Sequence, residues 1–370
     1  MKIMTVFGTR PEGVKMAPII KELQKRETIE QVVCITAQHR EMLDQVINLF
    51  GIIPDYDLNI FKPGQTLTDI TTNALKGLEE VIMKEKPDVL LVQGDTTTVF
   101  AGALAAFYQK IKIGHVEAGL RSGNMYSPYP EEANRKLTGV LTNFHFAPTK
   151  KNFDNLVSEG YSKDKIFITG NTVIDALKYA IKKDYKFSDE RLNNIDYDNK
   201  KVILVTSHRR ENLGEPMENI FKAIRDVVDS HEDSLVVFPV HLNPKVRELA
   251  EDILGNNNRI LLTEPLDYEP FTNLMSRVYA VVTDSGGLQE EAPAMGKPVL
   301  VVREETERPE GIEAGTAKLV GTSYNSVYTN LKELLDNSTL YDSMAKAVNP
   351  YGDGNASQKI VDIILSSINE

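Results

Sequence analysis

Acidic and basic side chains in this sequence gather at one kind of position, directly after short apolar runs or in the loops that follow them. The acids are Asp95, Glu117 and Glu131, and the basic residues are Arg10, Lys15, His208, Arg209 and Arg210. If the apolar runs are parallel strands, these residues lie beyond the strands' carboxyl ends, where open α/β sheets bind ligands. Acids and bases gathered there predict a substrate that is an anion and also a target for proton transfer.

The elements that would position these residues are short apolar runs that alternate with longer helical patterns. The first series of predicted strands is 2–7, 31–36, 88–93, 112–118, 144–148 and 165–170. The second series is 201–207, 234–240, 259–263, 279–284, 297–302 and 317–321. This alternation is less regular over 170–200. We interpret these residues as a linker region, in which the helix TVIDALKYAIKK connects the two series. A β-then-α order predicts parallel sheets with helices on both faces.

A chain of 370 residues is long enough for two domains, each with its own core. We expect an α/β fold of two Rossmann-like, doubly wound domains, one over 1–170 and the other over 171–354. The helical pattern at 355–370 could pack back on the first domain. A cleft between two such domains would suit a ligand with two ends, such as a nucleotide and a sugar.

Composition excludes several classes of function. A net charge of −11 argues against non-specific binding to nucleic acid or to an anionic membrane, so an anionic ligand needs a local basic pocket. No stretch approaches the ~18–20 apolar residues that span a bilayer, and the first residues do not form a signal peptide. The single cysteine, Cys34, lies in an apolar run and allows no internal disulfide, which fits a cytoplasmic location. No cluster of His, Cys and Asp has metal-ligand spacing.

A glycine turn in the second half predicts a phosphate site. It follows a strand that ends at Asp284, it precedes a short helix, and it consists of Ser285, Gly286 and Gly287. Unpaired N–H groups and a partial positive charge make helix N-termini good anion sites. One turn in, Glu290 and Glu291 could accept hydrogen bonds from ribose hydroxyls. The alternative is an N-cap with a tight turn and two solvated glutamates.

Two further loops follow the first strand of each series. GTRPEGVK offers Arg10 and Lys15 to an anion, although it is not a dinucleotide-binding G-x-G-x-x-G. SHRREN presents His208, which could act as an acid, a base or a diphosphate ligand. Among the other histidines, His115 and His145 lie inside apolar runs and are expected in the core.

Each candidate acid has a plain structural alternative. Asp95 precedes threonines and could be an N-cap, and Glu131 begins a helix, where carboxylates are favoured by the dipole. Three acids on three successive strand-end loops of one domain are harder to explain in this way. We therefore interpret Asp95, Glu117 and Glu131 as a proton-transfer group.

Ten stretches, taken jointly and in order, resemble the non-hydrolysing bacterial UDP-N-acetylglucosamine 2-epimerases over essentially the full length. They are GTRPE (8–12), AQHREMLDQV (37–46), QGDTTT (93–98), GHVEAGLRS (114–122), PEEANR (130–135), TGNTVIDAL (169–177), SHRRENLGEPM (207–217), PVHLNP (239–244), TDSGGLQEEAP (283–293) and TERPEG (306–311). The resemblance implies a GT-B-like fold with UDP in the cleft and interconversion of UDP-GlcNAc and UDP-ManNAc for cell-envelope or capsular polysaccharide. It also implies a homodimer and no cofactor.

The same resemblance implies roles for individual residues. The catalytic residues would be Asp95, Glu117, Glu131 and His208. The substrate contacts would be Arg10, Lys15, Arg135, Phe271, Ser285, Gly286, Gly287 and Glu291. A regulatory site for a second UDP-GlcNAc would include Gln38, His39, Gln65, Glu131 and one arginine of the pair Arg209 and Arg210. Glu41 and Gly64 depart from the family's expected Gln and Arg, and losing an arginine should weaken an anion site.

Four other activities remain compatible with parts of this pattern. A hydrolysing epimerase would release ManNAc and UDP, and a sister enzyme would act on another UDP-2-acetamido sugar. A GT-B glycosyltransferase would share the fold but has little use for three carboxylates. A non-catalytic UDP-sugar sensor would not need the candidate acids at all.

Overall fold

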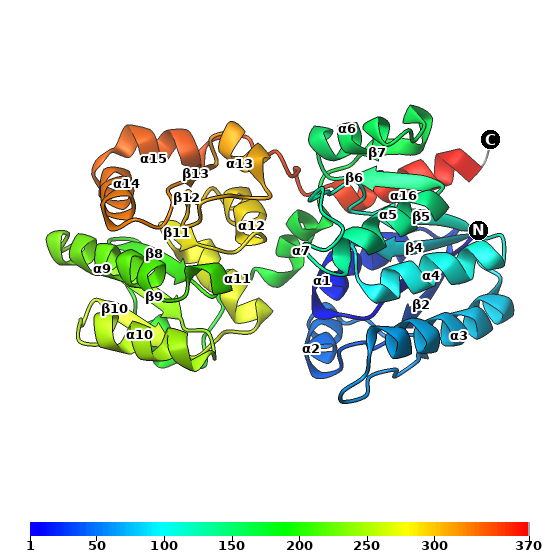
Figure 1. The fold of residues 1–370 in the computed structure, drawn as a ribbon, viewed down its shortest axis with the longest axis horizontal. Coiled ribbons are helices and arrows are strands. Elements are labelled where there is room, and N and C mark those ends of the chain that lie inside the picture. Colours follow the sequence, from blue (N-terminus) through cyan, green and yellow to red (C-terminus); the bar gives the residue numbers. More distant parts are fainter. Residues whose placement is uncertain (369–370) are drawn as a thin grey trace. The chain divides into compact units, whose positions relative to one another are not determined.

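The structure, a computed structural model, describes residues 1–368, and the chain folds into two compact units (Figure 1). The first unit consists of residues 1–179 and the C-terminal segment that begins at Tyr351. The second unit consists of residues 180–350. The chain therefore changes unit after residue 179, nine residues beyond the boundary drawn from the sequence.

The first unit contains a seven-stranded parallel sheet in the order β3-β2-β1-β4-β5-β6-β7. Its strands are β1 (Lys2–Phe7), β2 (Glu30–Ile35), β3 (Tyr56–Asp57), β4 (Val89–Gln93), β5 (Lys112–Val116), β6 (Phe144–Ala147) and β7 (Ile166–Ile168). The strand order reverses between β1 and β4, so these two neighbours form the topological switch point of the sheet.

Helices follow most of these strands. They are α1 (Arg10–Leu23), α2 (Glu41–Phe50), α3 (Leu67–Glu85), α4 (Thr97–Tyr108), α5 (Glu131–Leu141), α6 (Lys150–Ser158), the short η1 (Lys163–Lys165), α7 (Thr172–Ala180) and α16 (Ala356–Ile368). Residues of α3 and α4 form one apolar cluster with Met4 and Val6 of β1. Helix α1 lies on the other face, where its Gly13 approaches Phe7. The first unit is thus doubly wound.

The second unit contains a six-stranded parallel sheet in the order β10-β9-β8-β11-β12-β13. Its strands are β8 (Lys201–Thr206), β9 (Ser234–Pro239), β10 (Ile260–Thr263), β11 (Ala280–Thr283), β12 (Val299–Val301) and β13 (Ala317–Leu319). Its helices are α8 (Glu190–Asn193), η2 (Arg210–Asn212), α9 (Glu215–Ser230), α10 (Pro244–Leu254), α11 (Tyr268–Arg277), α12 (Leu288–Ala294), α13 (Pro309–Glu313), α14 (Tyr324–Asp336) and α15 (Ser338–Ala345). The switch point lies between β8 and β11.

Alternate residues of the central strand β8 enter two different cores. Ile203 and Val205 belong to a cluster with α9 and α14, whereas Val202 and Leu204 belong to a cluster with α11 and α12. Successive side chains of a strand point to opposite faces, so a strand covered on both faces is a continuous apolar run. This confirms the expected α/β fold of two doubly wound, Rossmann-like domains.

The twelve strands predicted from the sequence are all present, each within two residues at either end. The prediction missed β3, because a two-residue strand contains no apolar run. Helix α7 belongs to the first unit since its Asp175 accepts hydrogen bonds from the backbone N–H groups of Ala356 and Ser357 at the start of α16. Helix α16 in turn packs on α1, and Asp362 forms an ion pair with Arg26. No helix in the described part of the chain is long and apolar enough to cross a bilayer.

Candidate active site

The candidate residues of the first unit emerge from the neighbouring strands β1, β4 and β5 at their carboxyl ends. Arg10 and Lys15 lie in the first turns of α1, just after β1. Asp95 follows β4, and Glu117 follows β5. Because β1, β4 and β5 are adjacent in the sheet, three separate loops are brought to one edge at the switch point.

Glu117 is held by side chains from three other segments. Its Oε1 lies 2.7 Å from Lys15 Nζ and accepts a 3.0 Å hydrogen bond from Asn171 Nδ2. Its Oε2 accepts hydrogen bonds from Lys15 and from Gln93, the last residue of β4. The backbone of Glu117 has a φ of +64°, a conformation that is unfavourable outside glycine and is retained only where its surroundings over-determine it. The carboxyl group is therefore held in one orientation and contacts a cationic side chain.

Asp95 is tied to helix α5 through Arg135. The guanidinium donates from Nε to Asp95 Oδ2 at 2.9 Å, and its Nη2 lies 2.6 Å from the same oxygen. Arg135 Nη1 lies 3.1 Å from Glu132 Oε2. Asn134 adds a bond to the backbone carbonyl of Asp95. Arg135 is buried, and its guanidinium faces these two protein carboxylates.

Glu132 anchors the loop before α5. Its carboxylate accepts hydrogen bonds from the backbone N–H groups of Ser122 and Gly123. Burial favours the neutral acid, but these bonds and Arg135 outweigh it and lower the pKa of Glu132. In the sequence Glu132 is simply the second of two adjacent acids at a helix start, and nothing in the pattern distinguishes it from Glu131.

Glu131 and Arg10 differ from the residues above in having fewer protein partners. Glu131 begins α5, and its Oε2 is buried with no hydrogen-bond partner among the described residues. Arg10 is partly exposed at the start of α1, and its guanidinium has no hydrogen bond or ion pair within the described part of the chain. Both side chains are available to a ligand.

Glu12 is a buried carboxylate that the sequence analysis did not single out. It accepts hydrogen bonds from the N–H of Gly8 at 3.2 Å and from Thr96 Oγ1 at 2.9 Å, so it joins the loop of Arg10 to that of Asp95. Burial raises the pKa of Glu12 to about 7. Its only signal in the sequence was a first-turn acid, which is common at helix starts.

No hydrogen bond or ion pair in the described structure joins the residues expected in a regulatory site to one another. Gln38 accepts a 2.9 Å hydrogen bond from Thr98, three residues beyond Asp95. The side chain of His39 is exposed, and Gln65 accepts a bond from the N–H of Lys62 in its own turn. Their regulatory role stays a prediction.

In the second unit, one buried carboxylate organises the loop that carries His208. Asp284, at the end of β11, accepts hydrogen bonds at Oδ2 from Ser207 Oγ, from the N–H groups of His208 and Arg209, and from Asn212 Nδ2. Its Oδ1 lies 3.2 Å from His208 Nδ1. Arg209 Nε donates to the backbone carbonyl of Asp284, and Arg210 is exposed in η2. Sequence analysis placed Asp284 only at a strand end.

His208 lies beside a second histidine and is 40% exposed. The rings of His208 and His241 stack with centroids 5.7 Å apart. Burial lowers the pKa of His208, Asp284 raises it, and His241 and Arg209 lower it further, with a net lowering. His115 and His145 are buried in the core of the first unit, as the sequence predicted.

The glycine turn of the second unit lies between β11 and α12, as predicted. Gly287 is exposed and Ser285 is partly exposed, and the N–H of Ser285 is bonded to Thr283 Oγ1. The two glutamates of α12 differ: Glu290 is buried in an ion pair with Arg308, whereas Glu291 is partly exposed. Gly286 lies against the guanidinium of Arg308, which a Cβ at this position would approach to 3.5 Å. Phe271 on α11 is partly buried against the core of this unit.

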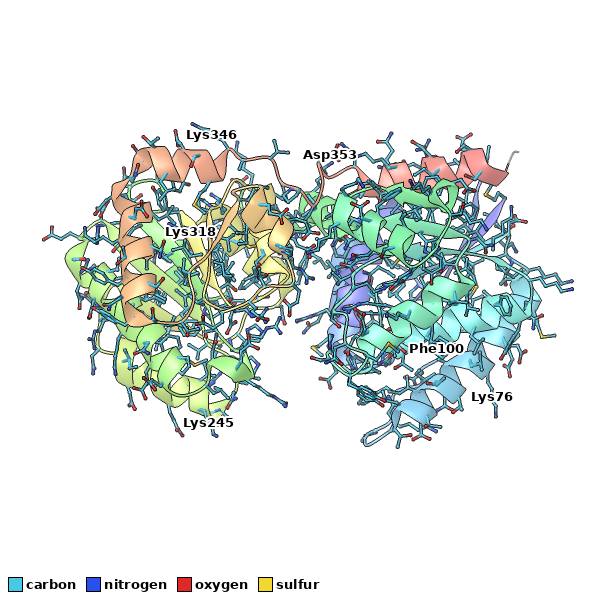
Figure 2. The ribbon with its side chains drawn as sticks, turned by 45° about the horizontal axis from the view of Figure 1, so that its top comes forward. Lys76, Phe100, Lys245, Lys318, Lys346 and Asp353 are labelled. Carbon is cyan, nitrogen blue, oxygen red and sulfur yellow. The ribbon has the colours of Figure 1, made fainter. Side chains whose placement is uncertain are left out.

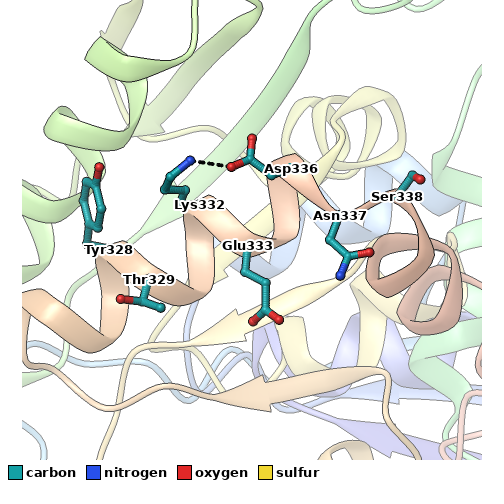
Figure 3. A pocket seen from close by; sticks show the side chains of 7 residues that line it. All are labelled: Tyr328, Thr329, Lys332, Glu333, Asp336, Asn337 and Ser338. Atoms are coloured by element: carbon teal, nitrogen blue, oxygen red, sulfur yellow. Dashed lines mark hydrogen bonds and ion pairs between the residues drawn. The ribbon is translucent and has the colours of Figure 1, made fainter.

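Three further observations concern features outside the candidate site. An open depression beside α14 lies along a single helix and the residues just after it, far along the chain from every candidate residue, and contains the Lys332–Asp336 ion pair (Figure 3). Among residues 1–368, no group of three or more His, Cys, Asp or Glu side chains could hold a metal ion. The single cysteine, Cys34, is buried, and burial raises the pKa of its thiol to about 12.

Comparison with known proteins identifies relatives along the whole chain. A family model described as UDP-N-acetylglucosamine 2-epimerase matches residues 21–365. The UDP-N-acetylglucosamine 2-epimerase of Bacillus subtilis (strain 168) is 56% identical over 365 residues, which cover 99% of this chain and 95% of that protein. The Escherichia coli (strain K12) enzyme of the same name is 52% identical over 99% of each chain.

A solved structure extends the comparison to three dimensions. The crystal structure of UDP-GlcNAc 2-epimerase from Neisseria meningitidis, bound to UDP-GlcNAc, has a TM-score of 0.87 and 53% sequence identity. The match covers 99% of this chain and 100% of that one. The similarity therefore extends over both units.

Proposed function

The chain belongs to the UDP-N-acetylglucosamine 2-epimerase family, and from this we propose that it interconverts UDP-GlcNAc and UDP-ManNAc by removing and returning the proton at C2. The observation that carries the proposal is the arrangement at the switch point of the first unit. There Glu117 is held by Lys15, Gln93 and Asn171, beside the loop of Asp95. The product would supply ManNAc-type sugars for envelope polysaccharide.

The chemistry requires the anomeric bond to break before C2 can exchange its proton. C2 has no neighbouring carbonyl, so its proton is not acidic in the substrate. Departure of UDP with the C1–O electron pair, through an oxocarbenium-like state, acidifies it. A carboxylate then takes the proton and leaves 2-acetamidoglucal and UDP. Protonation of C2 from the other face and return of UDP to C1 give the epimer, so acid/base groups are needed on both faces.

The surroundings of the three acids suggest different roles. Glu117 is held by its ion pair with Lys15, and a carboxylate in this position suits stabilisation of positive charge at C1. Asp95 is oriented by Arg135, which we assign as a positioning residue, and it suits removal of the proton. Glu131 has a buried Oε2 without a partner in the described structure, which suits a group that exchanges a proton.

The leaving UDP needs groups that stabilise its growing negative charge. We assign the diphosphate to Arg10, His208 and the turn of Ser285 and Gly286, and the ribose to Glu291. Phe271 would lie near the uracil. Arg10 has no partner in the described chain, and the backbone of the turn is accessible at Gly287. These placements rest on the chemistry of the side chains and the family resemblance.

The decisive test is NMR of UDP-GlcNAc with the purified protein in D2O and no added cofactor. We expect UDP-ManNAc with deuterium at C2. Free ManNAc and UDP would instead identify a hydrolysing enzyme, and no reaction would call for the same test with other UDP-2-acetamido sugars. The Asp95→Asn variant is expected to lose activity by about 10²-fold or more. Unchanged activity in this variant would contradict the assignment of Asp95.

We further propose that the protein is a homodimer that acts in the cytoplasm. Helix α4 is apolar around its whole circumference, which is typical of a buried helix. Its outer residues Phe100 and Phe107 nevertheless lie at the surface, and Leu137 and Val140 of the adjacent α5 are 47% and 73% exposed (Figure 2). An apolar face of this kind supports contact with a second copy.

Replacing an apolar side chain at this face should dissociate the dimer. We expect Phe107→Asp to shift the protein to the monomer in sedimentation velocity, because a buried charge opposes association. Ile53→Asp is the matched control, since Ile53 is also an exposed apolar residue of the first unit but lies in the loop after α2. A wild-type protein that sediments as a monomer at micromolar concentration would contradict the dimer.

A further inference from the structure

The Asp284 carboxylate is completely buried, yet no Lys or Arg side chain forms an ion pair with it in the described structure. Its charge is met by N–H and O–H groups and by one imidazole. Burying a carboxylate is costly unless it is hydrogen-bonded, and bonds to an ionised acceptor are the strong ones. An asparagine at this position would avoid the desolvation cost of a carboxylate, so the presence of an aspartate calls for an explanation. The contact with His208 supplies one.

We propose that Asp284 is a positioning residue for His208: it holds the imidazole through Nδ1 and thereby presents Nε2 as the nitrogen that meets the diphosphate. This rests on the proposed function only in naming the diphosphate as the ligand. The orientation of the ring and the position of its proton follow from contacts within the second unit alone.

The two oxygens of Asp284 have separate tasks. Oδ2 accepts four donors that fix the backbone of residues 207–209 and the side chain of Asn212. Oδ1 is buried and has no hydrogen-bond partner in the described structure, although His208 Nδ1 lies only 3.2 Å away. One oxygen therefore anchors the loop and the other orients the ring.

The 3.2 Å distance between Asp284 Oδ1 and His208 Nδ1 favours one tautomer of the imidazole. A proton on His208 Nδ1 would give this buried oxygen a donor, whereas a bare Nδ1 would place two acceptors 3.2 Å apart. In the neutral ring Nε2 then has a lone pair, and in the charged ring it is the acidic N–H. The His208 side chain is 40% exposed, so a ligand can reach the ring.

Asp284 also opposes the other groups that face His208. His241 from the end of β9, Arg209 from the same loop and burial itself all lower the pKa of the imidazole, and only Asp284 raises it. Without the carboxylate, all of the remaining effects would lower the pKa of His208 and so disfavour the charged ring. A charged ring is the form that can donate a proton to departing UDP.

The Asp284→Asn variant tests this role directly, because an amide group has only one oxygen and cannot replace both oxygens of the carboxylate. Four donors face Oδ2, so the amide oxygen must stay there, and the NH2 group must face His208 Nδ1. Two donors cannot share that contact, and the ring is therefore forced to the Nε2–H tautomer. The chain offers a matched control in Asp336, whose Oδ1 lies 3.0 Å from Nε2 of His231 elsewhere in the same unit. Asp336→Asn perturbs a histidine–carboxylate pair that has no candidate role.

The test is 15N NMR of the imidazole groups in the full-length protein, assigned with His208→Gln and His231→Gln. We expect His208 to have a protonated Nδ1 in the wild type, and Asp284→Asn to convert it to the Nε2–H form and lower its pKa by about one unit or more. Asp336→Asn should leave the His208 signals unchanged. A wild-type His208 in the Nε2–H form would overturn the proposal, and that measurement needs no variant to fold.

Kinetics supply the second readout. In the epimerase assay, Asp284→Asn should lower kcat by about 10²-fold or more and move the alkaline limb of its pH profile to lower pH, whereas Asp336→Asn should stay within about twofold. The imidazole signals report on Asp284 even if the protein proves inactive on UDP-GlcNAc, so failure of the proposed function is distinguishable. Unchanged imidazole signals in Asp284→Asn would refute the positioning role whatever the activity.

Discussion

At the scale of the residue, the ion pair of Lys15 and Glu117 is the contact that we expect to matter most for activity. Lys15 Nζ lies 2.7 Å from both oxygens of Glu117, and the two side chains are only 20% and 10% exposed. Replacing Lys15 with Met keeps the aliphatic stem but leaves the carboxylate without this cation. We expect kcat to fall by about 10²-fold or more, measured by NMR of UDP-GlcNAc turnover.

Lys25 provides the comparison for this variant. It lies just beyond the end of α1, is 61% exposed and pairs with Glu22 at 2.8 Å. Exposed ion pairs contribute about 0–1 kcal/mol, so Lys25→Met should change neither stability nor turnover appreciably. Equal losses of activity in Lys15→Met and Lys25→Met would show that the effect is not specific to the Glu117 contact.

At the scale of the element, the first unit depends on a link between α7 and the start of α16. Asp175 is buried on α7 and accepts from the backbone N–H groups of Ala356 and Ser357 and from the Ser357 hydroxyl. Asp175→Ala would leave two buried N–H groups without their acceptor. We expect a loss of about 2–4 kcal/mol in the free energy of unfolding, measured by urea titration.

The control for the α7–α16 link is Ser357→Ala, which removes the hydroxyl but leaves both backbone bonds to Asp175. Its expected cost is about 1 kcal/mol. If Asp175→Ala proved no more destabilising than Ser357→Ala, the carboxylate would not be the cap that joins the C-terminal helix to this unit.

At the scale of the whole molecule, buried ionisable groups make stability depend on pH in two opposite directions. Burial lowers the pKa of His145 to about 3 and that of His115 to about 4, below the usual 6.5. As pH falls, these histidines are therefore protonated in the unfolded chain at a higher pH than in the folded protein. Their contribution to stability is present above pH 6.5 and is lost as pH falls. Glu12, with a pKa raised to about 7, contributes below pH 4.5 and loses that contribution as pH rises to 7.

The contributions of the two histidines and of Glu12 overlap in pH, so a single-residue variant is needed to separate them. His145→Phe should reduce the loss of stability between pH 7 and pH 5 by about 2 kcal/mol, at about 1.4 kcal/mol per pH unit below 6.5. The measurement is the free energy of unfolding at both pH values, with His39→Asn as a control because the side chain of His39 is exposed. An identical pH dependence in His145→Phe and the wild type would contradict the burial effect.

The positions of the strands and the identity of most candidate residues could be predicted from apolar patterning and motif position. Continuous apolar runs bounded by polar loops are the direct consequence of burying a parallel strand on both faces, so all but the two-residue β3 could be predicted. The acids after β4 and β5 and the turn after β11 followed from the same reasoning, because ligand-binding residues of such sheets lie beyond the strand ends.

Contacts between side chains from different segments became evident only in the folded protein. Glu117 is contacted from three segments, Arg135 turns to Asp95, and Asp284 orients His208 across 76 residues. These contacts depend on which strands are neighbours, and periodicity within a segment contains no information about sheet order. The roles of Glu12 and Asp284 were missed for this reason. The sequence does not distinguish a buried acid from an exposed one, and only the packing around the side chain shows which groups donate hydrogen bonds to it.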